Sequence, residues 1–288
     1  MKKRLNNAKD TIKDFFENFI KVLRRRDMVL LPGTLSFFFV LAIIPTLGLI
    51  SYAASILNLS TDILYDFMAN SFSMEIADLI LGVDLTNTAG ISFFVTVLIG
   101  LYIASNSADA IIMASNTIYG IEPNSWLKRR IKAIGISFLI VVLLIFMLIV
   151  PVFGDNIIAL VNDVHLSEII STRIIAVINL LKGPISWLIM FAIIRIIYVV
   201  SPDKKPKNRV VNYGAIFTTV GWILGTKIYS MYVTNYANYT ALYGGLASIV
   251  VLMIWIYFLS FIFTAGIALN SQKDQNNLLK TGTIKLKK

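Results

Sequence analysis

The sequence predicts an all-α, polytopic membrane protein with six transmembrane helices, and two observations support this fold class. Hydrophobic residues make up 57% of the 288 residues and the mean hydropathy is +0.76, which is typical of chains whose surface faces lipid. Nearly all lysines and arginines lie in segments 1–27, 121–132, 201–209 and 273–288, with acidic or neutral connections between them. Because cytoplasmic loops concentrate Lys and Arg, this alternation predicts that both termini are cytoplasmic.

Residues 1–27 are predicted to form an amphipathic helix that lies on an anionic membrane surface. Apolar residues such as Ile12, Phe16 and Leu23 recur at helical spacing, with lysines and arginines between them. A solvated, partly helical charged leader is the alternative interpretation. Residues 28–272 are predicted to form the membrane domain, and residues 273–288 a basic cytoplasmic tail.

Six apolar segments are predicted to span the membrane. They are residues 29–50, 91–118, 133–150, 185–200, 211–232 and 242–270. In the first, Pro45 removes a backbone hydrogen bond and is expected to kink the helix. The fourth is short because Lys182-Gly183-Pro184 interrupts the apolar run before it. In the fifth, the spacing of Gly221 and Gly225 favours close contact with another helix.

A polar stripe on the second span is the strongest indication of a functional site. At about 100° per residue, one helix face collects most of the polar side chains of this span. The stripe consists of Tyr102, Ser105, Asn106, Asp109, Met113 and Asn116. An ionised carboxylate near the bilayer centre costs about 3 kcal/mol, so Asp109 is expected to face protein or water rather than lipid.

Two further charges fall within predicted spans and complete a predicted intramembrane polar pathway. At 1.5 Å per residue, Arg195 lies about 7 Å and Asp109 about 15 Å inside the cytoplasmic boundary. Arg195 either reaches toward Asp109, if the second and fourth helices are neighbours, or extends to the headgroups. Lys227, about 25 Å from that boundary, is expected to extend to the outer surface.

The sequence lacks the residues and motifs that most enzymes need. It contains no cysteine, and its one histidine, His165, falls in a predicted outer loop. No phosphate-binding loop, metal-binding histidine motif or nucleophile elbow is present, so we expect no cofactor and no metal. The net charge of +10 is explained by membrane topology and anionic lipid, so no nucleic-acid partner is expected.

Short motifs in five of the predicted spans resemble those of one bacterial family. They are paired aromatics before a proline (Phe37, Phe38, Pro45), an Asn-x-x-Tyr-Gly end (Asn116, Tyr119, Gly120), a Tyr-x-x-x-Pro exit (Tyr198, Pro202), a Gly-Ala opening (Gly214, Ala215) and the pattern of the last span (Tyr243, Gly244, Trp255, Tyr257, Gly266, Leu269, Asn270). Together they resemble the YihY/BrkB family of bacterial inner-membrane proteins, formerly labelled ribonuclease BN. Ala42 and Ala268 depart from the family pattern, which has a serine and an acidic residue there, so the roles of those side chains are not carried over.

The resemblance implies a six-helix protein of the bacterial cytoplasmic (inner) membrane whose activity is poorly defined. A ribonuclease is disfavoured because phosphodiester hydrolysis usually needs metal ligands or an acid–base pair on the cytoplasmic surface. The leading hypothesis is a transporter or flippase-like protein for a lipid or other amphiphile, with membrane lipids as partners. The alternative is a non-catalytic envelope scaffold or assembly factor, in which the stripe only holds helices together.

The predicted topology can be tested by thiol labelling, because the chain has no cysteine of its own. Segment 58–90 has acidic residues and no Lys or Arg, so a Ser73→Cys variant is expected to react with a membrane-impermeant reagent only from outside the cell. A Ser125→Cys variant in basic segment 121–132 serves as the control and should react only from the cytoplasmic side. Labelling of Ser73→Cys from the cytoplasmic side alone would contradict the topology.

Overall fold

The computed structural model describes residues 20, 24, 27–56, 65, 74, 91–140, 173–177, 181–236 and 245–280. These residues form helices and connecting turns, and the described part of the chain contains no strand. The helices are α2 (Asp27–Ile56), α5 (Ile91–Tyr119), a helix over residues 126–140, a short helical segment over residues 173–177, the π-helical turn η1 (Leu181–Ile185), α8 (Ser186–Val200), α9 (Asn208–Tyr236) and α11 (Gly245–Lys280). The predicted all-α class is therefore confirmed.

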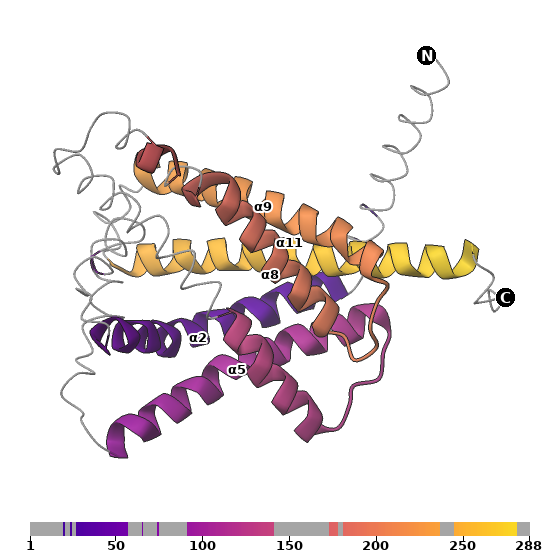
Figure 1. Ribbon diagram of the computed structural model, residues 1–288, viewed down its shortest axis with the longest axis horizontal. Helices are drawn as coiled ribbons and strands as arrows, with labels where there is room; N and C mark the ends of the chain where they lie inside the picture. The colour runs from indigo at the N-terminus through magenta and orange to yellow at the C-terminus, as the bar shows by residue number, and fades with distance from the viewer. Residues whose placement is uncertain are drawn as a thin grey trace, which may run out of the picture.

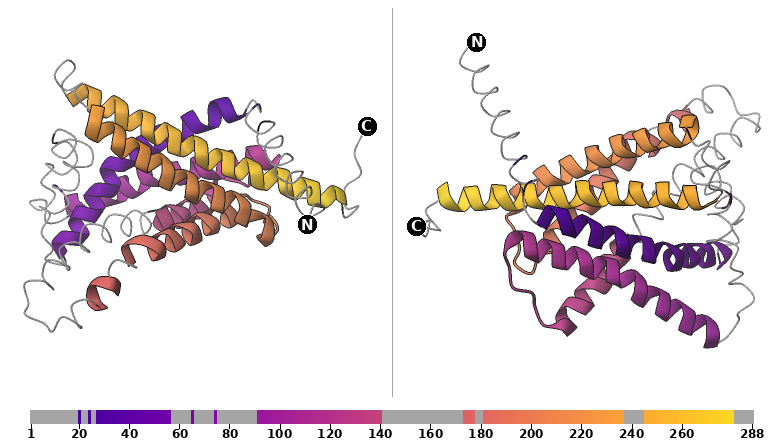
Figure 2. Two further views of the ribbon diagram at one scale, coloured as in Figure 1. Left: turned by 90° about the horizontal axis from the view of Figure 1, so that it is seen from above. Right: turned by 180° about the vertical axis from the view of Figure 1, so that it is seen from behind.

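The long helices form a bundle whose ends can be told apart by charge. Helices α2, α5, α9 and α11 run lengthwise through the molecule, with α2 packed on α5 and α11 packed on both α9 and α2 (Figures 1 and 2). Helix α8 packs on α9, and helix 126–140 turns back across α5 (Figure 1). The start of α2, the end of α5 and the end of α11 lie at the same end of the bundle (Figure 1).

We call this the basic end, because the loops and helix ends there carry most of the described cations. Loop 120–125 and the start of helix 126–140 are found here, together with loop 201–207 between α8 and α9 (Figure 1). The cations are Lys128, Arg129, Arg130, Lys132, Lys204, Lys205, Lys207, Arg209 and Lys273.

Two stretches of the described residues are long and apolar enough to cross a membrane. They are Gly183–Val200 and Val250–Asp274, with mean hydropathies of 2.0 and 2.3, and Met28–Ala42 is a shorter apolar helix. Helix α11 continues beyond its predicted span to Lys280, and its 36 residues correspond to about 54 Å, more than the thickness of the hydrocarbon layer. The six spans and their orientation stay predictions.

Several predicted features lie partly or wholly outside the described residues. The amphipathic segment 1–27 is described only at Ile20, Arg24 and Asp27, and residues 141–150 and 281–288 are not described. Helix α2 runs without interruption past Pro45, and the kink there stays a prediction. The interruption predicted before the fourth span is the π-helical turn η1, which contains Pro184 and continues directly into α8.

Helices α9 and α11 pack closely because glycines face the contact. A Cβ on Gly221 would lie 2.7 Å from the Ile262 side chain, and one on Gly225 would lie 2.9 Å from Phe258, which confirms the predicted close approach. Nearer the basic end, Gly214 on α9 faces the backbone carbonyl of Gly266 on α11. Its backbone N–H donates to Asn270 Oδ1 at 2.7 Å, so the contact is hydrogen-bonded as well as tight.

A methyl group at Gly214 is expected to destabilise the bundle. Gly214→Ala would place a Cβ against the Gly266 carbonyl oxygen, a backbone atom that cannot rotate away, at a cost of about 1–3 kcal/mol. Thermal unfolding in detergent, followed by tryptophan fluorescence, should show a lower melting temperature. Gly33→Ala is the matched control, because its Cβ would meet nothing within 4 Å in a helix that prefers alanine. Equal effects of the two substitutions would refute the tight contact.

Candidate functional site

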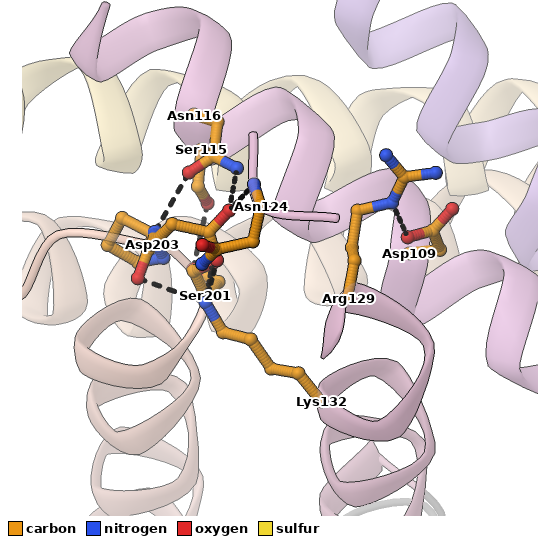
Figure 3. A network of polar contacts seen from close by, with 9 residues as sticks. Asp109, Ser115, Asn116, Asn124, Arg129, Lys132, Ser201 and Asp203 are labelled. Atoms are coloured by element: carbon orange, nitrogen blue, oxygen red, sulfur yellow. Dashed lines mark hydrogen bonds and ion pairs between the residues drawn. The ribbon is translucent and has the colours of Figure 1, made fainter. Parts of the chain in front are cut away.

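A cluster of polar side chains centred on Asp203 joins four segments at the basic end; we call it the Asp203 clamp (Asn116, Asn124, Lys132, Ser201 and Asp203; Figure 3). Asp203 lies in loop 201–207 and its backbone N–H donates to Asn116 Oδ1 on α5 at 2.8 Å. In return, Asn116 Nδ2 donates to Asp203 Oδ2 at 2.8 Å, and the Asn124 backbone N–H donates to the same oxygen at 2.9 Å. One aspartate therefore binds the end of α5 and the loop that follows it.

Lys132, from helix 126–140, uses all three ammonium hydrogens in the clamp. Its Nζ donates to the Ser201 carbonyl at 2.7 Å, the Pro202 carbonyl at 3.0 Å and Asp203 Oδ1 at 2.8 Å. The side chain of Asp203 is only 5% exposed, so its charge is compensated within the protein. A lysine at the carbonyl end of α8 also interacts favourably with the helix dipole.

The pKa of Asp203 reflects this environment. Burial raises the pKa of the carboxyl group, but the hydrogen bonds from Lys132, Asn124 and Asn116 outweigh burial and lower the pKa to about 2. Asp203 is therefore ionised at neutral pH. A permanently charged carboxylate with filled acceptor sites acts as a structural anchor rather than as a proton-transfer group.

The local structure at the end of α5 positions Asn116 for the clamp. Gly120 has a positive φ of 66°, a conformation that glycine adopts without strain. The Gly120 N–H bonds to the Thr117 carbonyl and the Ile121 N–H to the Asn116 carbonyl, a pairing that ends helices at such a glycine. The chain then turns toward loop 201–207. On the last turn of α5, Ser115 Oγ lies 2.8 Å from Ser201 Oγ of that loop.

A second cluster lies next to the first, where helix 126–140 crosses α5; we call it the arginine face (Tyr102, Asn106, Asp109, Arg129 and Arg130). Arg129 Nε donates to Asp109 Oδ1 at 2.7 Å (Figure 3). Arg130 donates to Asn106 Oδ1 at 2.8 Å and to the Tyr102 carbonyl at 3.0 Å, and its guanidinium carbon lies 3.9 Å from the centre of the Tyr102 ring. Two successive arginines therefore lie along one face of α5.

The polar stripe predicted on α5 divides into a buried part and a partly exposed part. Ser105 and Asn116 are buried, and Ser105 Oγ donates back to the Tyr102 carbonyl of its own helix. The Asp109 and Arg129 side chains, by contrast, are 25% and 20% exposed, and Tyr102 is 58% exposed. Met113 is also exposed, so the polar residues of the exposed part belong to the arginine face and Met113 adds an apolar side chain beside them.

The other two predicted charges do not join these clusters. Arg195 Nε donates to Asn212 Oδ1 at 2.7 Å and so links α8 to α9, whereas the partner of Asp109 is Arg129. Lys227 is exposed on α9. The structure thus brings together Tyr102, Asn106 and Asp109, and leaves Arg195 and Lys227 apart from them.

The sequence reasoning missed Asp203 and the specific partners of the stripe. Arg129, Arg130 and Lys132 were interpreted only as topology-determining cations. One signal was available: Asp203 is the only acidic residue in segment 201–209, which otherwise carries four cations. An acid in that position, directly after Pro202, indicates a specific partner rather than a general charge effect.

Comparison with known proteins places the chain in a family. A protein-family model described as "Virulence factor BrkB" matches residues 19–283. The chain belongs to the BrkB family. Among its relatives, a ribonuclease-like protein of Bacillus subtilis, YfkH, is 32% identical over 82% of this chain and 86% of its own length.

Other BrkB relatives are named as membrane proteins. A UPF0761 membrane protein of Glaesserella parasuis is 27% identical over 46% of each chain, and one of Idiomarina loihiensis is 30% identical over 31% of each. No solved structure matches the chain. With its apolar helices and these relatives, the chain is a membrane protein of the BrkB family.

Three of the motif residues that resembled the BrkB family, Asn116, Tyr198 and Asn270, join separate segments of the bundle. Asn116 binds Asp203, and Asn270 binds the backbone of Gly214. The Tyr198 hydroxyl is 2.6 Å from Thr218 Oγ1 and donates to the Phe263 carbonyl at 2.7 Å, so it joins α8 to α9 and α11. These residues therefore maintain the bundle that carries the two clusters.

The stability that Asp203 provides should depend on pH in a defined direction. Because the pKa of about 2 in the folded protein lies below the ordinary aspartate pKa of 3.8, ionised Asp203 stabilises the fold by about 2 kcal/mol at neutral pH. This contribution should decrease as the pH falls through about 4 toward 2. The melting temperatures of wild type and Asp203→Asn should therefore differ at pH 7 and converge at low pH.

The matched control for this experiment is Glu122→Gln, which removes one negative charge from an exposed side chain on loop 120–125. Its effect on stability is expected to stay within about 0.5 kcal/mol. If the difference in melting temperature between wild type and Asp203→Asn stays constant or widens in acid, the stability of the clamp does not depend on the ionised carboxylate.

Proposed function

We propose that the chain is a transporter or flippase-like protein that moves a lipid or other amphiphile, and that the headgroup follows the arginine face. One observation supports this function above all. The Asp109–Arg129 ion pair is partly exposed on the surface of the bundle, ten residues before α5 ends, which corresponds to about 15 Å along the helix. Charged groups at such a position are uncommon in membrane proteins and generally functional.

The surroundings of the ion pair favour an amphiphilic ligand. Helix 126–140 exposes apolar side chains at helical spacing, including Leu127, Ile131, Ile134 and Phe138, each more than half exposed. In a bilayer these side chains contact acyl chains, and Arg130 of the arginine face borders them, three residues after Leu127 and four before Ile134. A molecule with a polar headgroup and apolar chains matches both surfaces.

We further propose that the chain lies in the bacterial cytoplasmic membrane with six spans and both termini in the cytoplasm. Two observations support this arrangement. The start of α2 and the end of α11 lie at the same end of the bundle, as an even number of spans requires (Figure 1). That end also carries the described clusters of Lys and Arg, which the positive-inside rule assigns to the cytoplasm. Membrane lipids are then the natural partners, and no nucleic-acid partner is proposed.

A non-catalytic envelope scaffold or assembly factor is the second candidate, and the buried part of the stripe favours it. Ser115 and Asn116 bind Ser201 and Asp203 in a packed interface between helices, as expected if polar residues serve only to hold the bundle together. This explanation covers the Asp203 clamp. It does not cover Tyr102, Asp109 and Arg129, which are partly exposed.

We propose no catalytic reaction. The ribonuclease-like name belongs to the Bacillus relative, and the carboxylates of both clusters, Asp109 and Asp203, are each bound by a cation of the same chain. A carboxylate whose oxygen is engaged by a cation of the same chain is not free to take a proton from a substrate.

Lipid translocation in reconstituted liposomes tests the proposed function. Purified protein should accelerate the movement of fluorescent phospholipids between leaflets, and Asp109→Asn should reduce the rate at least about tenfold, because it breaks the ion pair on the headgroup path. Glu122→Gln, which removes an acidic charge outside both clusters, should translocate at the wild-type rate. Equal rates in protein-containing and empty liposomes would contradict lipid transport and favour the scaffold.

A further inference from the structure

We infer that the arginine face is a binding site for a phospholipid whose headgroup carries a primary ammonium as well as the phosphate, in the manner of phosphatidylethanolamine. The inference rests on the proposed function only in taking the ligand to be a membrane lipid. What is inferred is the chemical class of the headgroup that binds. Binding of a lipid can be measured even if the protein does not move that lipid across the membrane.

The two arginines of the site differ in how their hydrogen-bonding groups are used. Arg130 is held by three contacts, to Asn106, to the Tyr102 carbonyl and to the face of the Tyr102 ring. Arg129 binds Asp109 through Nε (Figure 3), so its two terminal nitrogens still carry N–H groups that this hydrogen bond does not use. A guanidinium presents donors in a planar fork that matches phosphate oxygens, so Arg129 is the group placed to receive a phosphodiester.

Asp109 determines which headgroup is accepted. When Arg129 turns toward a phosphate, the carboxylate of Asp109 loses its cation while it remains partly buried, and a new cation must compensate it. A primary ammonium in the same headgroup can donate hydrogen bonds to this carboxylate. An anionic headgroup without an ammonium would instead bring a second negative charge next to Asp109.

The charge pattern of the free site therefore matches a zwitterion. With Arg130 fixed by Asn106 and Tyr102, the exchangeable groups are one carboxylate and one guanidinium, with a net charge of zero. In a headgroup with one phosphate and one ammonium, the phosphate takes the place of Asp109 beside Arg129. The ammonium takes the place of Arg129 beside Asp109. A quaternary ammonium has no N–H to donate, so it should bind Asp109 less well than a primary ammonium.

The acyl chains have a surface to occupy beside this site. Trp126 and Leu127 are 62% and 61% exposed on the first turn of helix 126–140, where Lys128 separates them from the two arginines, and Met113 is exposed one turn after Asp109 on α5. Apolar groups thus adjoin the charged groups on both helices. This neighbourhood favours an intact lipid over a soluble headgroup compound.

Native mass spectrometry of the full-length protein, with phosphatidylethanolamine and phosphatidylglycerol offered at equal concentration, tests the inference. Wild type is expected to retain phosphatidylethanolamine with about a tenfold preference, the ratio that one additional ion pair of about 1.4 kcal/mol produces. Asp109→Asn should abolish the preference, and Arg129→Gln should weaken retention of both lipids. Asp109→Glu keeps the charge and should keep the preference, which separates loss of the carboxylate from loss of the fold.

The outcomes separate this inference from the proposed function. Equal retention of the two lipids by wild type, or an unchanged preference in Asp109→Asn, would overturn the assignment of the headgroup even if lipids move across the liposome membrane. A preference that depends on Asp109 would support the site even if no translocation is measured. Glu122→Gln is again the matched control and should bind as wild type does.

Discussion

The arrangement of the basic end depends on the three hydrogen bonds that Lys132 donates to loop 201–207. They hold helix 126–140 against the end of α8, while Asn116 and the Asn124 backbone hold α5 and its following loop to Asp203. A buried charge pair is costly unless its remaining donors and acceptors are satisfied, and here the ammonium is fully paired. Removing either partner would leave an uncompensated charge, so the clamp fixes four segments together.

The clamp also determines where the arginine face can be. Arg129 and Arg130 precede Lys132 by only three and two residues, so within one turn helix 126–140 binds loop 201–207 and α5. The position of the guanidinium groups relative to Asp109 is thus set by hydrogen bonds that do not involve the site itself. Such support from outside a site is what keeps charged groups oriented before a ligand arrives.

The sequence predicted the helices and the stripe but not the partners of the stripe. Periodicity was sufficient to place Asp109, Asn106 and Tyr102 on one face of α5, because that depends only on the helical repeat. Whether Asp109 meets Arg195 or Arg129 depends on how helices cross, and residue spacing contains little information about crossing angles. The structure has helix 126–140 crossing α5 and Arg195 bound to Asn212, so of the two alternatives for Arg195 the approach to Asp109 is not formed.

The division of the stripe explains why one polar pattern can serve both stability and function. At Asn116 the stripe is covered by loop 201–207, and its hydrogen bonds are all directed at the protein. At Asp109 helix 126–140 crosses the stripe, and the ion pair keeps a partly exposed side. Because Lys132 anchors that helix, partner exchange at Arg129 requires rotation of one side chain and no movement of the bundle. The proposed ligand of matching charge would then break a single ion pair, Asp109–Arg129, and replace it with two of its own.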